Sequence, residues 1–540
     1  MSHRIVASLS IGAAMAIVAG AVVTVAGQDG ARGAGAKMEC ADLTSLTFEG
    51  QTTIAAASLV PAGPFVTPAG QTLTGLPAFC RVVGVSRPTS DSNINFEVWL
   101  PSSSWNGKFL SSGEGGYAGT LNYTRSGLDG GLDELIRRGY ATASTDTGHL
   151  SSDNDWAIGH PEKVIDYAYR AKHLVTVAAK GVVAAFYGKP ASYSYFNSCS
   201  NGGRQGLMEV QRYPEDYDGV VVGAPWNFQS HSNAGFVWDA QALGAAGAEI
   251  PPAKLPAIQA AAIAACDADD GLADGLIEDP STCAFEPATL LCKGADADTC
   301  LTAAQVTALG KLYDGPKNPR TGAQIYPGWA RGGEMGWARS VVGRDVTNLG
   351  RTYFSRLVFE NPAWDYRTFN FDTDLSLAES KVGKLADAIE PNLSAAKRQG
   401  AKIIQYHGWN DQTLQPGNSP AYYERVIAAM GDLANTQDFY RLFMVPGMAH
   451  CYFGPGASSF GGVGQQRPPA RDALHDVQTA LENWVEKGVA PNQLVATKYI
   501  DDAAATSTVK LTRLLCPYPS VARYKSGSPN DASSFVCTTP

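Results

Sequence analysis

Ten cysteines constrain the fold of this 540-residue chain more than any other feature of its sequence. An even number of cysteines behind an apolar N-terminal segment is typical of an oxidising compartment and predicts five disulfides. No two of them form a CxxC motif, which argues against a thiolate zinc site. Proximity along the chain pairs four sets of neighbours and leaves Cys199 for Cys451. The predicted bridges are Cys40–Cys80, Cys199–Cys451, Cys266–Cys283, Cys292–Cys300 and Cys516–Cys537.

The N-terminal segment has the pattern of an export signal. One firm positive charge, Arg4, precedes an uncharged run from Ile5 to Gly27, with small residues near a cleavage point after Gly27. We predict that residues 1–27 are an export signal, with a retained single-span anchor as the alternative. The protein is then secreted or periplasmic, without stable membrane association after signal removal.

The cysteine pair left over by proximity borders two residues with catalytic chemistry. Cys199 immediately precedes Ser200, and Cys451 immediately follows His450. A bridge between them would hold a hydroxyl beside an imidazole, which is what a serine nucleophile and its base require. An ordinary structural bridge is the alternative, but it leaves the position of both cysteines unexplained. We therefore predict that Ser200 is the nucleophile and His450 its base.

The sequence around Ser200 predicts a strand, a sharp turn and a helix. Residues 193–197 form a short aromatic run, and Leu207, Met208 and Val210 follow at helical spacing. Such a turn exposes the hydroxyl and points backbone N–H groups at a developing oxyanion. The G-x-S-x-G pattern is degenerate, because Ser198 replaces its first glycine. A glycine-rich turn without catalytic function is the alternative.

The third member of a Ser, acid, His series should lie between the other two in the chain. Asp411 follows a predicted strand at 402–407, whereas Asp432 and Asp438 lie in helical or polar loop sequence. We predict that Asp411 orients His450. His407 ends the same strand and is expected to pack near the site without acting in it.

A glycine-dense loop is expected to complete the site. The sequence KFLSSGEGGYAG, residues 108–119, reads as a strand followed by that loop. The backbone N–H groups of Gly115 and Asn201 are predicted to lie about 3 Å from the developing charge. A flexible turn is the alternative.

Three motifs together resemble the tannase and feruloyl esterase family of α/β-hydrolases. They are CSNGGRQG at 199–206, HGWNDQ at 407–412 and GMAHC at 447–451, and the resemblance extends from about Cys40 to Cys537. It implies an α/β-hydrolase fold, with residues 28–225 and 391–540 as the catalytic domain. In that family a disulfide joins the cysteines beside the serine and the histidine, in agreement with the pairing above.

Residues 226–390 change in composition and are predicted to form an inserted lid domain that covers the active site. Within them, CDADDGLADGLIEDPSTC at 266–283 is rich in carboxylates and suits a hard cation such as calcium. It is not an EF-hand, because Leu272 occupies the obligatory glycine place, and an acidic surface loop is the alternative. The resemblance implies a structural calcium ion held by the side chains of Asp267, Asp270 and Asp274 and the main-chain oxygens of Leu272 and Leu276.

The net charge of −9, without a basic tract, argues against a nucleic-acid partner. The resemblance implies a serine esterase that hydrolyses small aromatic esters of the hydroxycinnamoyl (feruloyl) or galloyl type through an acyl-enzyme, without an organic cofactor. A noncatalytic binding module on this scaffold and a peptidase or amidase are rivals.

The alternative substrate within the family is mono(2-hydroxyethyl) terephthalate, whose free carboxylate needs a cation or hydrogen-bond donor. Arg351 and Arg356 are possible donors, in an aromatic segment at 350–369 that could form the acyl pocket or simply pack the lid. The terephthalate branch carries an arginine a few residues before this segment. Here residues 345–347 are Asp, Val and Thr, with Arg344 just upstream. This difference argues against a terephthalate monoester as the substrate.

Overall fold

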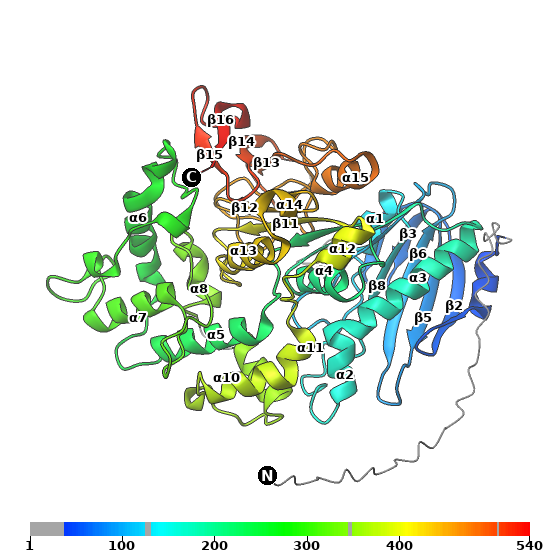
Figure 1. Ribbon diagram of the computed structural model, residues 1–540, viewed down its shortest axis with the longest axis horizontal. Coiled ribbons are helices and arrows are strands. Elements are labelled where there is room, and N and C mark those ends of the chain that lie inside the picture. The colour runs from blue at the N-terminus through cyan, green and yellow to red at the C-terminus, as the bar shows by residue number, and fades with distance from the viewer. Residues whose placement is uncertain (1–36, 125–130, 344–347, 505–506, 540) are drawn as a thin grey trace, which may run out of the picture.

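The computed structural model describes residues 37–124, 131–343, 348–504 and 507–539 (Figure 1). The predicted export signal at residues 1–27 lies outside them. The framework is a five-stranded antiparallel sheet in the order β1-β2-β5-β6-β8 and a five-stranded parallel sheet in the order β12-β11-β10-β9-β7. The antiparallel strands are Thr47–Phe48 (β1), Thr52–Val60 (β2), Phe79–Ser86 (β5), Ile94–Pro101 (β6) and Thr142–Thr145 (β8). The parallel strands are Lys108–Ser111 (β7), Tyr193–Cys199 (β9), Gly219–Gly223 (β10), Lys402–Gly408 (β11) and Tyr440–Val445 (β12).

The two sheets meet where β7 approaches the start of β8. The Leu110 N–H donates to the carbonyl of Ala141 at 2.9 Å, and the Ala141 N–H donates to the carbonyl of Lys108 at 3.1 Å. Three strand pairs complete the β-structure of the described residues. They are Gly63–Val66 (β3) with Thr72–Leu76 (β4), Leu494–Tyr499 (β13) with Val509–Leu515 (β14), and Val521–Tyr524 (β15) with Phe535–Thr538 (β16).

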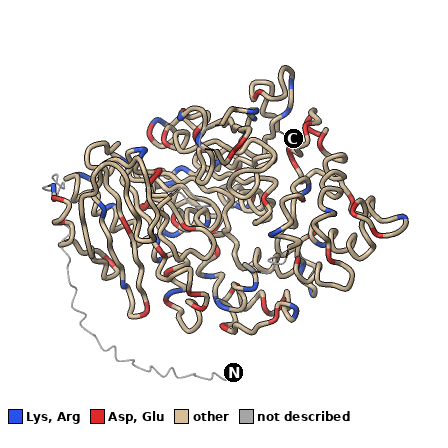
Figure 2. The backbone as a smooth tube through the Cα atoms, turned by 180° about the vertical axis from the view of Figure 1, so that it is seen from behind, with Lys and Arg blue, Asp and Glu red and all other residues tan. Residues whose placement is uncertain are grey.

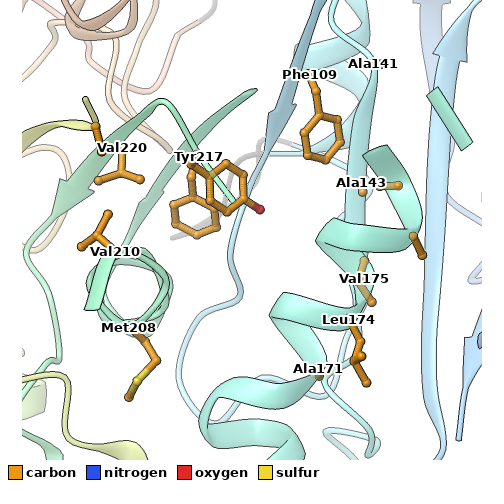
Figure 3. Close-up of a cluster of buried hydrophobic side chains, with 14 of the residues drawn as sticks. Phe109, Ala141, Ala143, Ala171, Leu174, Val175, Met208, Val210, Tyr217 and Val220 are labelled. Atoms are coloured by element: carbon orange, nitrogen blue, oxygen red, sulfur yellow. The ribbon is translucent and has the colours of Figure 1, made fainter. Parts of the chain in front are cut away.

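The parallel sheet is buried on both faces. All five residues of β10, GVVVG, are buried, as expected for a central parallel strand with an unbroken apolar sequence. Val220 and Val222 belong to one hydrophobic cluster, part of which is drawn in Figure 3, and Val221 belongs to another on the opposite face. The first cluster takes in side chains of Ala171–Tyr187 (α3), Asn201–Arg212 (α4) and Asn418–Met430 (α13), and the second those of Val477–Lys487 (α15). The α/β class expected from the sequence is confirmed.

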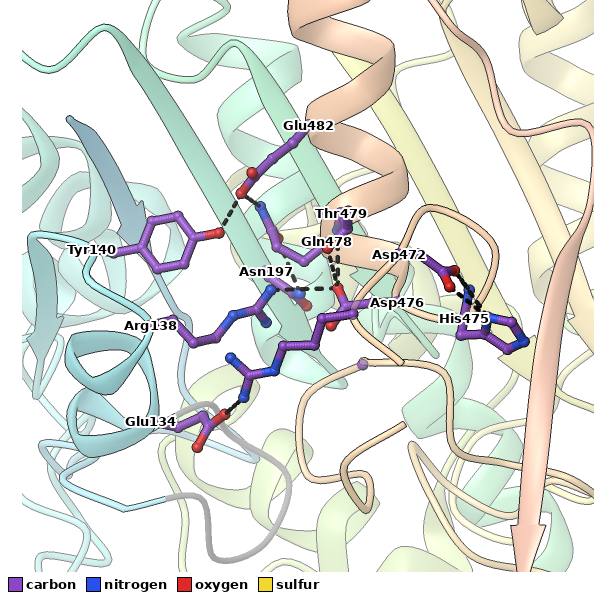
Figure 4. Close-up of polar contacts among 12 residues, drawn as sticks. Glu134, Arg138, Tyr140, Asn197, Asp472, His475, Asp476, Gln478, Thr479 and Glu482 are labelled. Atoms are coloured by element: carbon purple, nitrogen blue, oxygen red, sulfur yellow. Dashed lines mark hydrogen bonds and ion pairs between the residues drawn. The ribbon is translucent and has the colours of Figure 1, made fainter. Parts of the chain in front are cut away.

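A polar network ties α15 to the strands and helices beside it (Figure 4). Asn197 of β9 donates to Gln478 of α15 at 3.2 Å, and the Tyr140 hydroxyl donates to Glu482. Arg138 forms an ion pair with Asp476 at the start of α15, at 3.4 Å. The strand that leads to Ser200 is therefore held from the second face of the sheet as well as the first.

A long helical segment separates β10 from β11 and has a hydrophobic cluster of its own, which includes Trp226, Ile258, Leu309 and Trp337. In Figure 1 it lies to one side of the sheets, in green and yellow-green. Its helices are Gln229–Leu243 (α5), Leu255–Cys266 (α6), Ala303–Asp314 (α7), Trp337–Ser340 (α8), Asn348–Thr352 (α9), Thr373–Ala378 (α10) and Lys384–Ala386 (α11). The remaining α-helices of the described residues are Leu132–Arg137 (α1), Pro161–Ile165 (α2), Ser394–Gln399 (α12) and Leu433–Gln437 (α14).

The charged residues are dispersed. In the view of Figure 2, Lys and Arg lie scattered among Asp and Glu. Within the described part of the chain, none of the helices combines the length and the apolar character needed to span a bilayer.

Asp239 of α5 provides a test of how this helical segment responds to pH. Its carboxyl is 2% exposed and accepts a hydrogen bond from Trp329 Nε1 at 2.8 Å. Burial raises the pKa of Asp239 from 3.8 to about 8. Between these two values the folded chain keeps a proton that the unfolded chain releases, so this group lowers the free energy of unfolding as pH rises, by up to about 1.4 kcal/mol per pH unit.

We expect Asp239→Asn, which keeps the acceptor for Trp329 but cannot ionise, to remove this contribution. The gain in Tm of the variant over the wild type should grow as pH increases across that window, as followed by circular dichroism. A constant Tm difference would contradict the assignment.

Candidate active site

The predicted strand, turn and helix around Ser200 are confirmed as β9, Ser200 and α4. Ser200 has φ of 63° and ψ of −128°, a backbone conformation that costs a residue with a side chain about 1–3 kcal/mol. Its N–H donates to the Gly223 carbonyl at 2.9 Å. A Cβ atom at position 202 would overlap the Ser198 hydroxyl, and one at position 203 would overlap the Gly223 carbonyl. Gly202 thus makes room for the serine that replaces the first glycine of the usual pentapeptide.

Ser200, His450 and Asp411 form one hydrogen-bonded series. His450 Nε2 lies 3.0 Å from Ser200 Oγ, and His450 Nδ1 lies 2.6 Å from Asp411 Oδ2. An ionised carboxylate can only accept, so the proton of the neutral ring lies on Nδ1 and Nε2 is left to accept from the serine hydroxyl. The exposed fractions of the three residues are 5%, 5% and 2%, so the series is shielded from bulk water.

Four donors hold the Asp411 carboxylate. Oδ1 accepts the N–H groups of Thr413 at 2.7 Å and Leu414 at 2.9 Å, while Oδ2 accepts from His450 and, at 3.0 Å, from His407 Nε2. Burial acts to raise the pKa of Asp411, but the electrostatic attraction of His450 and the hydrogen bonds from His407 and His450 outweigh it. The net pKa is well below the ordinary value, so the carboxylate stays ionised.

His407 has a larger part in this geometry than the sequence indicates. It is 1% exposed, and its Nδ1 lies 2.7 Å from Ser419 Oγ, which fixes the ring that contacts Asp411. The only signal in the sequence is its position at the end of the strand that precedes Asp411.

All five predicted disulfides are present: Cys40–Cys80, Cys199–Cys451, Cys266–Cys283, Cys292–Cys300 and Cys516–Cys537. The bridge beside the site joins the last residue of β9 to the loop after β12, 252 residues away in sequence, with its Cα atoms 6.0 Å apart. Both cysteines are fully buried, and Cys451 has φ of 66°. The bridge therefore fixes the backbone next to both Ser200 and His450.

The glycine-dense loop after β7 is fastened to the first turn of α4. The Asn201 side chain donates to the Glu114 carbonyl at 3.0 Å, and the Glu114 N–H donates to Gln205 Oε1 at 3.0 Å. The N–H groups of Gly115 and Asn201 donate to no hydrogen-bond acceptor among the described residues. Both predicted oxyanion donors are thus available to a ligand.

The aromatic residues around the site are largely buried. The main-chain N–H of Trp226 donates to the Ser200 carbonyl at 3.0 Å, while its ring is 1% exposed and meets the Tyr117 ring edge to face, with centroids 5.2 Å apart. The aromatic composition of the segment at 350–369 suggested a pocket wall, but its rings are largely buried. Its Tyr353 and Phe354 are fully buried in a cluster that also contains Phe369. These side chains pack the inserted helical segment.

The two arginines considered for a substrate carboxylate are placed differently. Arg356 forms an ion pair with Asp155 at 3.0 Å and donates to Ser355 Oγ at 3.0 Å. Arg351 is exposed. Arg344 and residues 345–347 lie outside the described residues.

The acidic loop at 266–283 has its carboxylates largely satisfied by the protein. Asp267 accepts the backbone N–H groups of Asp274, Gly275 and Leu276, and Asp270 accepts that of Leu272. Asp274 is paired with Arg513.

Some His, Cys, Asp and Glu side chains of the described residues have ligand atoms within 4.8 Å of one another. The three aspartates predicted to bind calcium are not among these clusters. The carbonyl oxygens of Leu272 and Leu276 accept no hydrogen bond from another described residue, which leaves both available.

The chain is similar to known proteins along most of its length. A family model described as tannase and feruloyl esterase matches residues 80–538. An uncharacterized esterase of Xanthomonas campestris pv. campestris is 43% identical, over 93% of this chain and 92% of its own. The mono(2-hydroxyethyl) terephthalate hydrolase of Piscinibacter sakaiensis is 33% identical, over 88% of this chain and 87% of its own. The crystal structure of feruloyl esterase B from Aspergillus oryzae has a TM-score of 0.85 at 30% identity, covering 92% of this chain and 100% of that one.

Proposed function

Since the chain belongs to the tannase and feruloyl esterase family and is a carboxylic ester hydrolase, we propose that it cleaves esters of aromatic carboxylic acids by an acyl-enzyme mechanism at Ser200. The hydrogen-bonded series from Ser200 through His450 to Asp411 is the observation that carries the proposal. An intact series also argues against a binding module that has lost its chemistry.

The proposed reaction proceeds in two half-reactions. Ser200 Oγ attacks the ester carbonyl carbon while its proton passes to His450 Nε2, and the same nitrogen then returns the proton to the departing alcohol. Water attacks the acyl-enzyme, again giving its proton to His450, and the aromatic acid leaves as Ser200 recovers its hydroxyl hydrogen. Asp411 holds the ring and stabilises the imidazolium that forms in each half-reaction.

The oxyanion of both tetrahedral intermediates is proposed to bind the N–H groups of Gly115 and Asn201. Their lack of acceptors among the described residues supports this assignment, because preorganised donors need no rearrangement when charge develops. We further propose an α/β-hydrolase fold in which residues 226–390 form a lid.

Hydroxycinnamoyl and galloyl esters suit the described residues better than a terephthalate monoester. The latter brings a free carboxylate, and within the described residues of the 350–369 segment the partly buried arginine, Arg356, is already paired with Asp155. Mono(2-hydroxyethyl) terephthalate remains the alternative substrate, because a hydrolase of this ester is among the relatives of the chain. The five disulfides support a secreted or periplasmic location.

The test is hydrolysis of methyl ferulate, methyl gallate and mono(2-hydroxyethyl) terephthalate by the purified protein, with the amide of ferulic acid as the peptidase control. We expect turnover of a hydroxycinnamoyl or galloyl ester and none of the amide. Preference for the terephthalate ester would select the alternative substrate. Hydrolysis of the amide at a comparable rate, or of none of the four compounds, would contradict the proposed function.

We propose that the acidic loop binds a structural calcium ion through Asp267, Asp270 and Asp274 with the carbonyl oxygens of Leu272 and Leu276. The donor set is entirely oxygen, as calcium prefers, and the two carbonyls are available. Binding requires Asp274 to turn toward the ion from Arg513. The ion would balance the carboxylates of a loop already closed by Cys266–Cys283.

Calcium removal is expected to lower the Tm of the protein. A ligand at about 100 times its Kd stabilises the folded state by about 2.7 kcal/mol, and chelation abolishes this. The measurement is thermal unfolding with calcium, with magnesium and with EGTA, for the wild type and for Asp270→Asn. Asp269→Asn is the matched control, because Asp269 lies in the same loop and is exposed. A Tm unaffected by EGTA in the wild type would contradict calcium binding.

A further inference from the structure

A buried carboxylate without a hydrogen-bond partner lies at the end of α4 far from Ser200. Glu209 is 1% exposed, and neither of its carboxylate oxygens has a partner among the described residues. Figure 3 shows its neighbours Met208 and Val210 in the hydrophobic cluster that α4 shares with Leu174 and Val175 of α3. An ionised carboxylate costs several kcal/mol in such surroundings unless something compensates its charge.

Two further metal-binding side chains converge on Glu209. His173 comes from α3 and Asp216 from the loop between α4 and β10, and one ligand atom of each of the three residues lies within 4.8 Å of the other two. His173 Nδ1 lies 2.7 Å from Asp216 Oδ2. The ring of Tyr213 stacks on the imidazole at 3.7 Å with an interplanar angle of 8°, which fixes the ring orientation.

Neither neighbouring lysine among the described residues forms an ion pair with the carboxylates of Glu209 and Asp216. Lys172 donates to the Ser112 carbonyl, and its ammonium lies 3.8 Å from the Glu114 carboxylate. Lys180 donates to the main-chain carbonyls of Glu215 and Asp216 rather than to a side chain. The His173 side chain is 17% exposed, so a cation could reach the cluster from solvent.

We propose that His173, Glu209 and Asp216 bind a divalent transition-metal cation such as zinc or manganese. One imidazole with two carboxylates suits these ions, whereas the all-oxygen loop at 266–283 suits calcium. The ion would join α3 to α4, the helix that begins at the nucleophile, and so act on stability. The competing explanation is a protonated Glu209, because burial and then the adjacent Asp216 raise its pKa.

The experiment measures zinc binding by the full-length protein after treatment with chelator and dialysis. Zinc content is determined by elemental mass spectrometry, affinity by calorimetry, and the ligand environment by the visible absorption of a cobalt(II) substitute. Calcium is kept saturating throughout to separate this site from the acidic loop. The variants are Glu209→Gln and His173→Gln, with His160→Gln as the control, since His160 forms an exposed pair with Asp91 at the same 2.7 Å.

We expect one tightly bound zinc ion in the wild type and in His160→Gln, a rise in Tm on zinc addition, and cobalt absorption typical of nitrogen and oxygen ligands. Binding should weaken by at least about 10-fold in Glu209→Gln and His173→Gln. Zinc binding that is absent in the wild type, or unchanged in these two variants, would overturn the proposal. If the wild type binds no zinc and Glu209→Gln is more stable than it, the cluster holds a proton between Glu209 and Asp216 instead of a metal ion.

Discussion

Replacing Ser200 with alanine is expected to lower kcat for ester hydrolysis by about 10⁶-fold, to the level sustained by the remaining binding groups alone. The loss is large because in the proposed mechanism the hydroxyl forms the covalent intermediate, and no other nucleophile lies at hydrogen-bond distance from His450 Nε2 among the described residues. Initial rates on the preferred aromatic ester, together with a search for the acyl-enzyme by mass spectrometry, provide the measurement.

Asp411→Asn is the companion variant, with an expected loss of about 10⁴-fold in kcat. The amide would present a donor or a neutral acceptor to His450 Nδ1, so the imidazolium would lose its counter-charge. Both variants should unfold within a few degrees of the wild type if only chemistry is affected. Folded Ser200→Ala that keeps more than a few per cent of the wild-type rate would show that another residue carries the reaction.

Removing the Cys199–Cys451 bridge is expected to reduce both stability and activity. A bridge across 252 residues stabilises the fold by about 5 kcal/mol in the chain-entropy model. Cys451 also loses the link that supports its left-handed backbone, and His450 precedes it directly. We expect Cys199→Ala with Cys451→Ala to lower Tm strongly and to reduce kcat well before the chain unfolds.

The matched control is Cys292→Ala with Cys300→Ala, which removes a bridge across only 8 residues. In the same chain-entropy model its removal costs about half as much, and it adjoins none of Ser200, His450 and Asp411. Tm and kcat of both double variants, measured at temperatures below unfolding, separate the two effects. Equal kcat in the two variants would mean that the Cys199–Cys451 bridge does not position Ser200 and His450.

The hydrogen-bonded series of Ser200, His450 and Asp411 could be predicted from sequence because each residue stands next to a local marker. Ser200 and His450 each adjoin a cysteine, and Asp411 follows a strand at the expected place in the chain order. Their hydrogen bonds and the predicted disulfides are all observed. The short apolar and aromatic runs were sufficient to predict β7, β9 and β11, since a strand of a buried parallel sheet needs little other signal.

Other features depend on contacts that sequence spacing does not encode. His407 supports Asp411 through a buried contact with Ser419, and the partners of Glu209 come from a helix and a loop that only the fold brings together. The sequence of the segment at 350–369 shows that it is rich in aromatic residues but not where their side chains point. Packing into the helical segment could therefore not be distinguished from a pocket wall. The antiparallel sheet of β1, β2, β5, β6 and β8 carried no motif at all.

The junction of the two sheets bears on how the protein behaves in concentrated solution. An unpaired sheet edge is a template for another chain and hence for aggregation. At the junction of the two sheets, the hydrogen bonds between β7 and Ala141 occupy the outer edge of β7 within the molecule. At the opposite edge of the parallel sheet, Phe443 of β12 forms an antiparallel bridge with Pro517. Proline has no backbone N–H, so it cannot donate to the strand of another chain. The outer strand of the antiparallel sheet, β1, has only two residues. A strand of another chain therefore finds few unpaired backbone groups on these edges, which favours solubility.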